Sequence, residues 1–191
     1  MHQIITTEAI VLAKRAVGEA SARITLLTRE HGLLRAAARS SRVEHSKLRY
    51  GLEPLTLARY CLVRGKYEWR LTGVEEPSRG LVAPDALRRR VAGRVAQLVL
   101  RLIHGEEASP LLYADIKEGL LLLAGTGPGE VEAVESVLVL RILWRLGYLP
   151  HTEALAAFVE GEWSLELSAK ALASRSLLVR TINESLQATG L

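Results

Sequence analysis

The chain has 191 residues, of which 49% are hydrophobic and 24% are charged, and its formal net charge is +4. This balance is typical of a soluble globular protein and excludes disorder as the main state. A single cysteine excludes an internal disulfide and a structural zinc site built from thiolates. The sequence shows no signal segment and no apolar run near the roughly 20 residues that span a bilayer, so we expect a cytoplasmic protein without a membrane partner.

The positive charge is concentrated in the N-terminal part. Residues 1–80 hold 14 Lys and Arg against 8 Asp and Glu, a net charge of +6, whereas residues 81–191 hold 11 against 13, a net charge of −2. An asymmetry of this kind indicates a polyanionic partner for the N-terminal part. The alternative is a somewhat basic surface that is merely solvated.

The first strands are predicted from their alternating side chains. Residues 4–12 open the chain as a strand rich in β-branched residues. Residues 23–29 and 33–39 then alternate with a period of two, the pattern of strands with one face on a core. The connection 28–32 is a short hairpin loop, in which Gly32 is suited to a left-handed conformation. Together these residues predict a basic hairpin.

Two further strands follow the hairpin. Residues 52–64 indicate a long strand with Pro54 near its start, where a missing N–H group is tolerated. Gly65 and Lys66 fit a two-residue turn, and residues 67–72 alternate as a fifth strand. Five antiparallel strands without an intervening helix predict a small closed barrel.

The rest of the chain follows a helical period. Helices are expected over residues 84–102, 110–124, 130–146, 153–160 and 174–188. The first is expected to bury a stripe that includes Leu87 and Leu98, and the third, apolar nearly all round, is the expected centre of a helical bundle. The predicted fold class is α+β, with a five-stranded antiparallel barrel at residues 1–79 and an all-helical domain at residues 80–191.

Eight cations gather in the hairpin and the loops beside it, and such a cluster indicates phosphate contact. Arg35 and Arg39 share one face of the second hairpin strand, roughly 13 Å apart. The candidate phosphate-binding residues are Lys14, Arg15, Arg23, Arg35, Arg39, Arg42, Lys47 and Arg49. The first two are expected in the connection that precedes the hairpin.

Other residues have both a functional and a structural interpretation. Trp69 alternates with Tyr67, so it is expected to pack in the core instead of stacking on bases. The arginine-rich stretch 88–101 is either a second binding surface or a solvated helix face. Arg141 lies within an apolar helix, where it needs a partner if it is buried. We expect its aliphatic stem to carry the guanidinium to solvent.

The sequence does not assemble a nucleophile, a base and an oxyanion site, so we expect no enzyme activity, no cofactor and no metal. The five histidines lack metal-ligand spacing, and Cys61 is expected to be a small core residue. The stretch G-T-G-P-G at 125–129 follows a helix instead of a strand, unlike a dinucleotide-binding fingerprint.

Five segments together carry a family resemblance. They are T-E-A-I-V-L at 7–12, G-E-A-S-A-R-I-T-L-L-T-R-E-H-G at 18–32, S-K-L-R at 46–49, L-E-P-L-T at 52–56 and L-R-I-L-W-R-L-G-Y-L-P at 140–150. In these segments the chain resembles the RecO family of bacterial recombination mediators. The resemblance implies an OB-fold N-terminal domain followed by helices. Many members carry a four-cysteine zinc module after the last segment, but residues 151–163 contain no cysteine.

The resemblance also implies a function. It implies a non-catalytic mediator that binds single- and double-stranded DNA, promotes strand annealing and, with RecR, assists RecA loading. It further implies that the helical domain binds the C-terminal tail of single-strand-binding protein and that the protein is nucleoid-associated. One alternative is a protein-interaction adaptor of the repair machinery whose OB barrel has little DNA affinity, and another is an uncharacterised enzyme.

Overall fold

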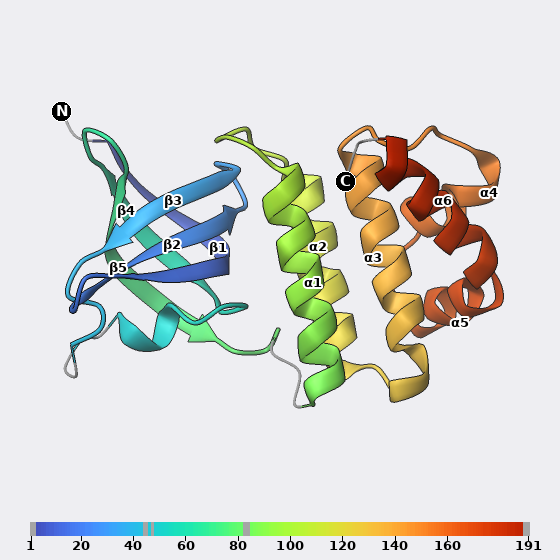
Figure 1. The fold of residues 1–191 in the computed structure, drawn as a ribbon, viewed down its shortest axis with the longest axis horizontal. Helices are drawn as coiled ribbons and strands as arrows, with labels where there is room; N and C mark the ends of the chain where they lie inside the picture. The colour runs from blue at the N-terminus through green and yellow to red at the C-terminus, as the bar shows by residue number, and fades with distance from the viewer. Residues whose placement is uncertain (1–2, 44–45, 47, 82–84, 189–191) are drawn as a thin grey trace. The chain divides into compact units, whose positions relative to one another are not determined.

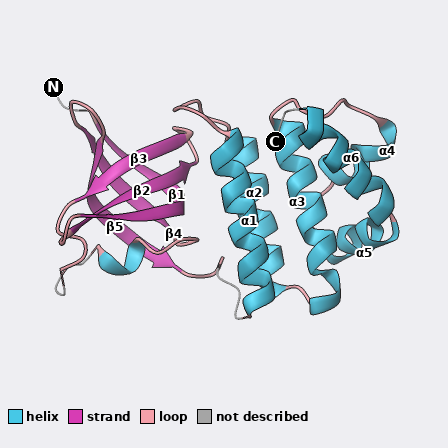
Figure 2. Ribbon diagram, in the orientation of Figure 1, coloured by secondary structure: helices cyan, strands magenta, loops and turns pink. Residues whose placement is uncertain are grey.

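The computed structural model describes residues 3–43, 46, 48–81 and 85–188. In these residues five strands come first and six α-helices follow (Figure 1 and Figure 2). The chain divides into two compact units, Met1–Val82 with Ala96–Tyr113 and Ala83–Val95 with Ala114–Leu191. The predicted succession of a barrel and helices is confirmed, and the domain boundary between residues 79 and 80 stays a prediction.

The strands close into a barrel. They are β1 (Ile4–Val17), β2 (Ser21–Thr28), β3 (Leu33–Ala38), β4 (Leu57–Arg64) and β5 (Trp69–Ser78). The order around the barrel is β1-β2-β3-β5-β4, and β1 is long enough to pair with β4 through its first half and with β2 through its second. The predicted five-stranded OB-type barrel is confirmed, and its β3–β5 seam is parallel whereas the other pairings are antiparallel.

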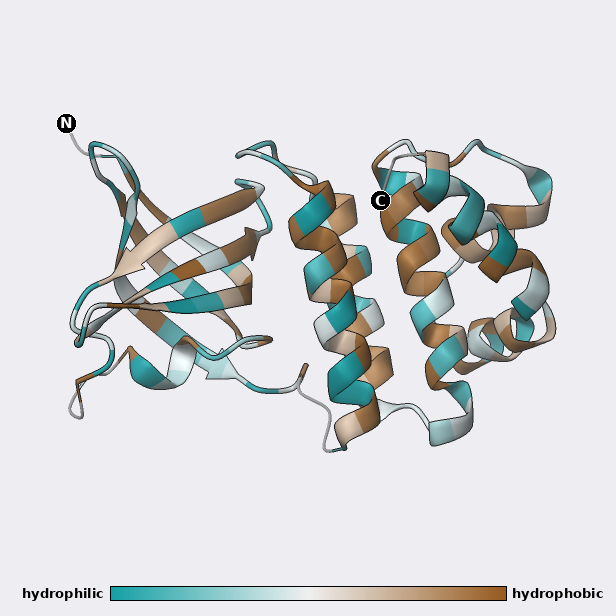
Figure 3. Cartoon of the chain, viewed as in Figure 1, coloured by the Kyte–Doolittle hydropathy of each residue, from teal (hydrophilic) through white to brown (hydrophobic). Residues whose placement is uncertain are grey.

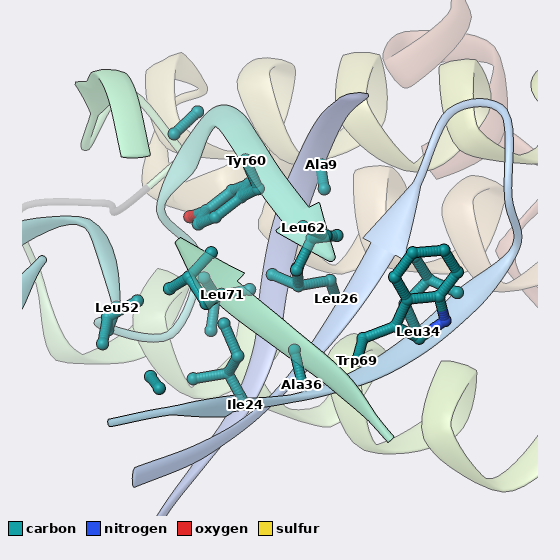
Figure 4. Packing of buried hydrophobic residues seen from close by; sticks show 13 residues of the cluster. Ala9, Ile24, Leu26, Leu34, Ala36, Leu52, Tyr60, Leu62, Trp69 and Leu71 are labelled. Carbon is teal, nitrogen blue, oxygen red and sulfur yellow. The ribbon is translucent and has the colours of Figure 1, made fainter. Parts of the chain in front are cut away.

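The barrel core is built from the inward side chains of the strands (Figure 4). Ile24 of β2 is opposite Ala36 of β3, and both are fully buried, as their alternation predicts. Trp69 is 3% exposed, which confirms its predicted core position. Tyr60 is also in the core, and its hydroxyl donates a hydrogen bond to the Gly51 carbonyl at 2.7 Å. Burial raises the pKa of Tyr60 well above its ordinary value.

The first strand is longer than predicted. Its pairing with β2 continues to Val17, which is opposite Ser21. Lys14 and Arg15 therefore lie within β1 and not in a connection. The turn that follows contains Gly18, whose positive φ of 60° allows the chain to reverse over few residues.

Two strand starts also differ from the predicted ones. β4 begins at Leu57 and not at residue 52, because Leu55 takes a left-handed φ of 64° that no continuous strand accommodates. β5 begins at Trp69, two residues later than predicted. The loop Gly65–Glu68 replaces the predicted two-residue turn, and the Gly65 N–H group closes it by donating to the Glu68 carbonyl at 3.0 Å.

Six α-helices and two short 3₁₀ turns complete the described structure. They are α1 (Ala86–Leu102), α2 (Pro110–Gly125), α3 (Val131–Arg145), α4 (Glu153–Val159), α5 (Leu165–Ala173), α6 (Arg175–Ala188), η1 (Arg49–Gly51) and η2 (Pro128–Glu130). In the second unit α4, α5 and α6 all pack on α3, the predicted centre of the bundle. Figure 3 shows hydrophobic stretches along α3. Among the described residues, no helix has both the length and the apolar character that a membrane crossing requires.

Two helical features depart from the predictions. The sequence did not reveal α5, whose first turn is capped by Ser164, the side chain of which accepts a hydrogen bond from the Leu167 N–H group at 3.1 Å. On α1, Leu87 is 46% exposed and Leu98 is only half-buried, whereas Val95 and Val99 are buried. The two valines are spaced by four residues, which places them on one ridge of the helix.

A segment after α1 packs on the barrel within the first unit. The Leu33 N–H group donates to the Gly105 carbonyl at 3.1 Å. Gly32 has the predicted left-handed conformation, with a φ of 62°. A Cβ atom at Gly32 would stand 2.3 Å from the Glu107 carbonyl oxygen, so only glycine permits this close approach. The start of β3 is thereby covered by residues from outside the barrel.

Candidate nucleic-acid interface

The outward side chains of β1, β2 and β3 place three of the predicted arginines on one face of the barrel. Arg15 is directly opposite Arg23 in the β1–β2 register, and Arg23 is opposite Ala37 in the β2–β3 register. Arg35 precedes Ala37 by two residues, so it is a diagonal neighbour of Arg23, about 7–8 Å away by strand geometry. All three arginines are exposed, and we call them the cationic face.

The three guanidinium groups of this face differ in what neutralises them. Arg23 donates from Nε and Nη2 to the Glu68 carboxylate at 2.8 and 3.3 Å, and this hydrogen bonding raises the pKa of Arg23. Like charges opposite one another on paired strands repel, so Glu68 relieves the repulsion between Arg15 and Arg23. Arg15 and Arg35 have no ion-pair partner among the described residues. Two cations of the face are thus available to a polyanion.

The segment after β3 carries further predicted cations. Arg39 follows the last residue of β3 and is exposed, so it lies beyond the strand face that it was predicted to share with Arg35. Arg42 donates from Nη1 to the Gly18 carbonyl at 2.7 Å, which ties it to the β1–β2 turn. Arg49 is exposed in η1. Lys47 is outside the described residues.

Lys14 is separated from the cationic face although it neighbours Arg15 in sequence. In the β1–β2 register Lys14 is opposite Ile24, whose side chain belongs to the barrel core. Its Nζ atom lies 2.8 Å from the Glu53 carboxylate, and its side chain is 22% exposed. Lys14 is therefore occupied by a partner within the barrel, on the opposite side of the sheet from the three arginines.

A groove of about 540 Å³ opens beside the cationic face. Its lining includes Arg23, Arg35, Arg64, Tyr67, Glu68, Trp69 and Glu106. The Glu106 carboxylate accepts hydrogen bonds from Arg64 at 2.6 Å and from Trp69 Nε1 at 3.1 Å. The Arg64 guanidinium also lies 4.9 Å from the centroid of the Trp69 ring. These contacts hold one wall of the groove in place.

The sequence did not indicate the part that Arg64 and Glu106 play in this groove. They are 42 residues apart, and the path of the segment after α1 brings them together. In the sequence, Arg64 is a predicted strand end, and Glu106 and Glu107 are an acidic pair much later in the chain. Neither pattern indicates a contact between them. A contact between residues so far apart in sequence can be predicted only when the fold is known.

Arg141 corrects a prediction in the second unit, which we call the helical unit. Its side chain does not reach solvent, because the residue is 3% exposed. It donates from Nη1 to Asp115 at 3.0 Å, from Nε to the Phe158 carbonyl at 2.8 Å and from Nη2 to the Gly161 carbonyl. Its guanidinium lies 4.2 Å from the centroid of the Trp163 ring. Burial lowers the pKa of Arg141, and the hydrogen bond to Asp115 acts in the opposite direction.

The arginine-rich stretch of α1 is partly neutralised by neighbouring groups. Arg94 donates two hydrogen bonds to Glu135, at 2.8 and 2.7 Å, and they raise the pKa of Arg94. Arg88 is half-buried and also paired. Arg90 and Arg101 are exposed and have no ion-pair partner in the part of the chain that the structure describes. Both belong to the arginine-rich stretch of α1, which is the alternative candidate for binding.

Cys61 and the possible metal-ligating side chains bear on chemistry other than phosphate binding. Cys61 is half-buried on the outward side of β4, with its sulfur 3.5 Å from the Thr6 hydroxyl and 3.7 Å from the Glu75 carboxylate, so the prediction of a core position is wrong. Within residues 3–43, 46, 48–81 and 85–188, no three His, Cys, Asp or Glu side chains are grouped so that they could hold a metal ion.

Comparison with known proteins identifies relatives of the chain. Residues 1–75 match the family model for the recombination protein O N terminal domain. A DNA repair protein RecO from Heliobacterium modesticaldum is 38% identical over 152 residues, which cover 78% of this chain and 53% of that protein. The chain resembles RecO. A RecO from Pelotomaculum thermopropionicum is 31% identical over 152 residues, which cover 79% of this chain and 58% of that protein.

The resemblance to RecO predicted from five segments is thereby confirmed, and the barrel is the part that matches the family model. A third RecO, from Caldanaerobacter subterraneus, is 25% identical over 169 residues, which cover 81% of this chain and 62% of that protein. The chain thus spans 53–62% of the length of these three RecO proteins.

Proposed function

We propose that the chain is a non-catalytic recombination mediator that binds single- and double-stranded DNA on the outer surface of its barrel. The observation that carries the proposal is the cationic face, on which Arg15 and Arg35 are exposed and have no ion-pair partner among the described residues. A guanidinium matches the oxygens of a phosphate in geometry and charge. Phosphate contacts position DNA without selecting a sequence, as a protein that acts on any damaged site requires.

The relatives extend the proposal to a role in DNA repair, because each is named a DNA repair protein. We infer that the chain promotes annealing of complementary strands and, with RecR, assists RecA loading. Cations that neutralise two phosphate backbones reduce the repulsion between the strands, which supports annealing. We further propose that the helical unit binds the C-terminal tail of single-strand-binding protein and that the protein is nucleoid-associated.

Reversing two charges of the cationic face tests the DNA-binding proposal. The variant R15E/R35E is expected to stay folded, because both side chains are exposed on the outer surface. Its affinity should fall for every sequence alike, and the logarithmic salt dependence on single strands should flatten by roughly 0.7 for each phosphate that the variant no longer neutralises. Fluorescence anisotropy titrations at several salt concentrations measure both quantities, and a strand-annealing assay should show a parallel loss.

The matched control reverses two charges in the arginine-rich stretch of α1. R90E/R101E changes the net charge by the same amount on exposed arginines of α1. It should keep the salt slope of the parent protein. If R90E/R101E loses DNA binding while R15E/R35E keeps it, the site lies on α1. If the parent protein binds no DNA at low salt, the chain is the adaptor considered as the alternative.

A further inference from the structure

Tyr67 holds an aromatic ring in solvent beside the groove. It is 87% exposed, more than any other large hydrophobic side chain among the described residues. The loop that carries it is closed by the hydrogen bond between Gly65 and Glu68, and a Cβ atom at Gly65 would lie 2.6 Å from the Glu68 carbonyl oxygen. This tight loop keeps the ring out of the barrel core. A ring in this position contributes little apolar burial to folding, so its surface is available to a ligand.

One cation lies over the ring of Tyr67, and another lines the same groove. Lys66 Nζ lies 5.0 Å from the ring centroid, so a cation covers one face of the ring. The exposed fraction of 87% leaves much of the remaining ring surface open to solvent. Tyr67 and Arg35 line the same groove of about 540 Å³. A nucleotide joins a flat base to a phosphate, and an exposed aromatic ring in the same groove as an arginine without an ion-pair partner matches both parts.

The charges of the groove leave one arginine for a ligand. Each of the two acids in the lining is hydrogen-bonded to an arginine, Glu68 to Arg23 and Glu106 to Arg64. Arg35 has no ion-pair partner among the described residues. An anionic group that enters the groove therefore meets an available guanidinium at Arg35. An acidic peptide could satisfy Arg35 as well, but the exposed ring distinguishes a ligand that carries a planar base.

We propose that this groove is a binding site for an unpaired nucleotide, in which Tyr67 stacks on the base and Arg35 contacts the phosphate. The inference rests on the proposed function and adds to it a site that favours single strands. In a duplex the faces of each base are covered by its neighbours, and exposing one requires unstacking that costs a few kcal/mol. Tyr67 therefore contributes to the binding of single strands and not to the binding of duplex.

The experiment compares DNA with and without bases. The probes are an oligothymidylate of about 20 nucleotides, longer than the roughly 4–16 that one OB-fold covers, an abasic strand of the same length and a duplex. Tyr67→Ala should weaken oligothymidylate binding roughly five- to hundredfold, the range of one base–aromatic stack. It should leave the affinity for the abasic strand and for the duplex unchanged. Tyr67→Phe, which keeps the ring, should behave as the parent protein.

Tyr50→Ala is the matched control. Tyr50 is 77% exposed and outside the lining of the groove, so its replacement should not change the preference for strands with bases. The inference is overturned if Tyr67→Ala leaves the affinity for oligothymidylate intact. It is also overturned if the variant loses affinity for the abasic strand and for oligothymidylate by the same factor. In that outcome the proposed function still stands if R15E/R35E lowers affinity for all probes. Failure of the parent protein to bind any probe would overturn both proposals.

Discussion

Arg141 in the helical unit and Arg35 on the barrel are the same residue type in opposite surroundings. Arg141 is 3% exposed and donates to Asp115 and to two backbone carbonyls. Arg35 is exposed and has no ion-pair partner among the described residues. A guanidinium whose donors are satisfied inside the fold cannot reach a phosphate without losing them. The number of arginines in a segment therefore does not show which of them a phosphate can reach, whereas the state of their donors does.

Replacing each arginine by methionine should separate the two roles most clearly. R141M leaves the buried Asp115 with Arg145 alone, at 2.6 Å. We expect the free energy of unfolding to fall by about 3 kcal/mol, at the lower end of the range for breaking a buried pair because Arg145 remains. R35M should change it by no more than about 0.5 kcal/mol. Urea denaturation measures both changes in stability. DNA titration should show the reverse order, with a lower DNA affinity for R35M and an unchanged DNA affinity for folded R141M.

A double variant tests the cause of the destabilisation at Arg141. Replacing Arg141 by Met and Asp115 by Leu together removes both buried charges, so the double variant should be more stable than R141M. Equal destabilisation by R141M and R35M would contradict the contrast between the two arginines. So would an equal decrease of DNA affinity in the two single variants under conditions where both are folded.

The barrel could be predicted from the sequence because its signals are local. Ile24 and Arg23 alternate in β2, Leu34 and Arg35 alternate in β3, and the alternation assigns each side chain to the core or to the outside. Gly32 marked the hairpin loop because its left-handed conformation disfavours other residues. The same alternation predicts the exposure of Arg23 and Arg35, whereas Arg15 was expected in a connection and lies in β1.

The remaining features depend on contacts between residues far apart in sequence. The apolar run around Arg141 gave no sign of Asp115, which lies 26 residues earlier, so the guanidinium was expected in solvent. Glu68 is 45 residues from Arg23 in the sequence and hydrogen-bonds to it in the fold. The sequence therefore did not predict that one cation of the cationic face is neutralised. The start of β4 was predicted too early for a local reason. Leu55 has a positive φ that ends any strand before it, and nothing in the sequence indicates this conformation.

Replacing Lys14 should cost less stability than replacing Arg141 and more than replacing Arg35, which sharpens the contrast between the two arginines. Because its partner Glu53 is 44% exposed and stays solvated alone, K14M should lower the free energy of unfolding by at most about 1 kcal/mol. DNA affinity and salt slope should not change, because Lys14 is on the inward side of β1 and is already paired. The neighbouring variant R15M should show the reverse, with unchanged stability and a flatter salt slope. A salt slope flattened equally by K14M and R15M would return Lys14 to the binding surface.

The smallest expected effect is a gain of function at Glu68. This carboxylate holds Arg23 through two hydrogen bonds, so in the free protein Glu68 occupies the donors that a phosphate would use. E68Q removes the negative charge and should raise DNA affinity by up to about fivefold, the scale of an exposed ion pair. If Arg23 then contacts a phosphate, the salt slope on single strands should steepen by roughly 0.7.

The control for this variant is E75Q, which removes an equal charge from β5 outside the groove, where Glu75 lies 4.0 Å from Arg59. A change in net charge alone would raise the affinity of both variants by the same factor, because both carboxylates are on the barrel and each is about half exposed or less. A larger gain for E68Q, with the steeper salt slope confined to it, would show that Glu68 competes with phosphate for Arg23. Equal gains would mean that Arg23 stays a structural cation, and the binding surface would then consist of the arginines that have no carboxylate partner.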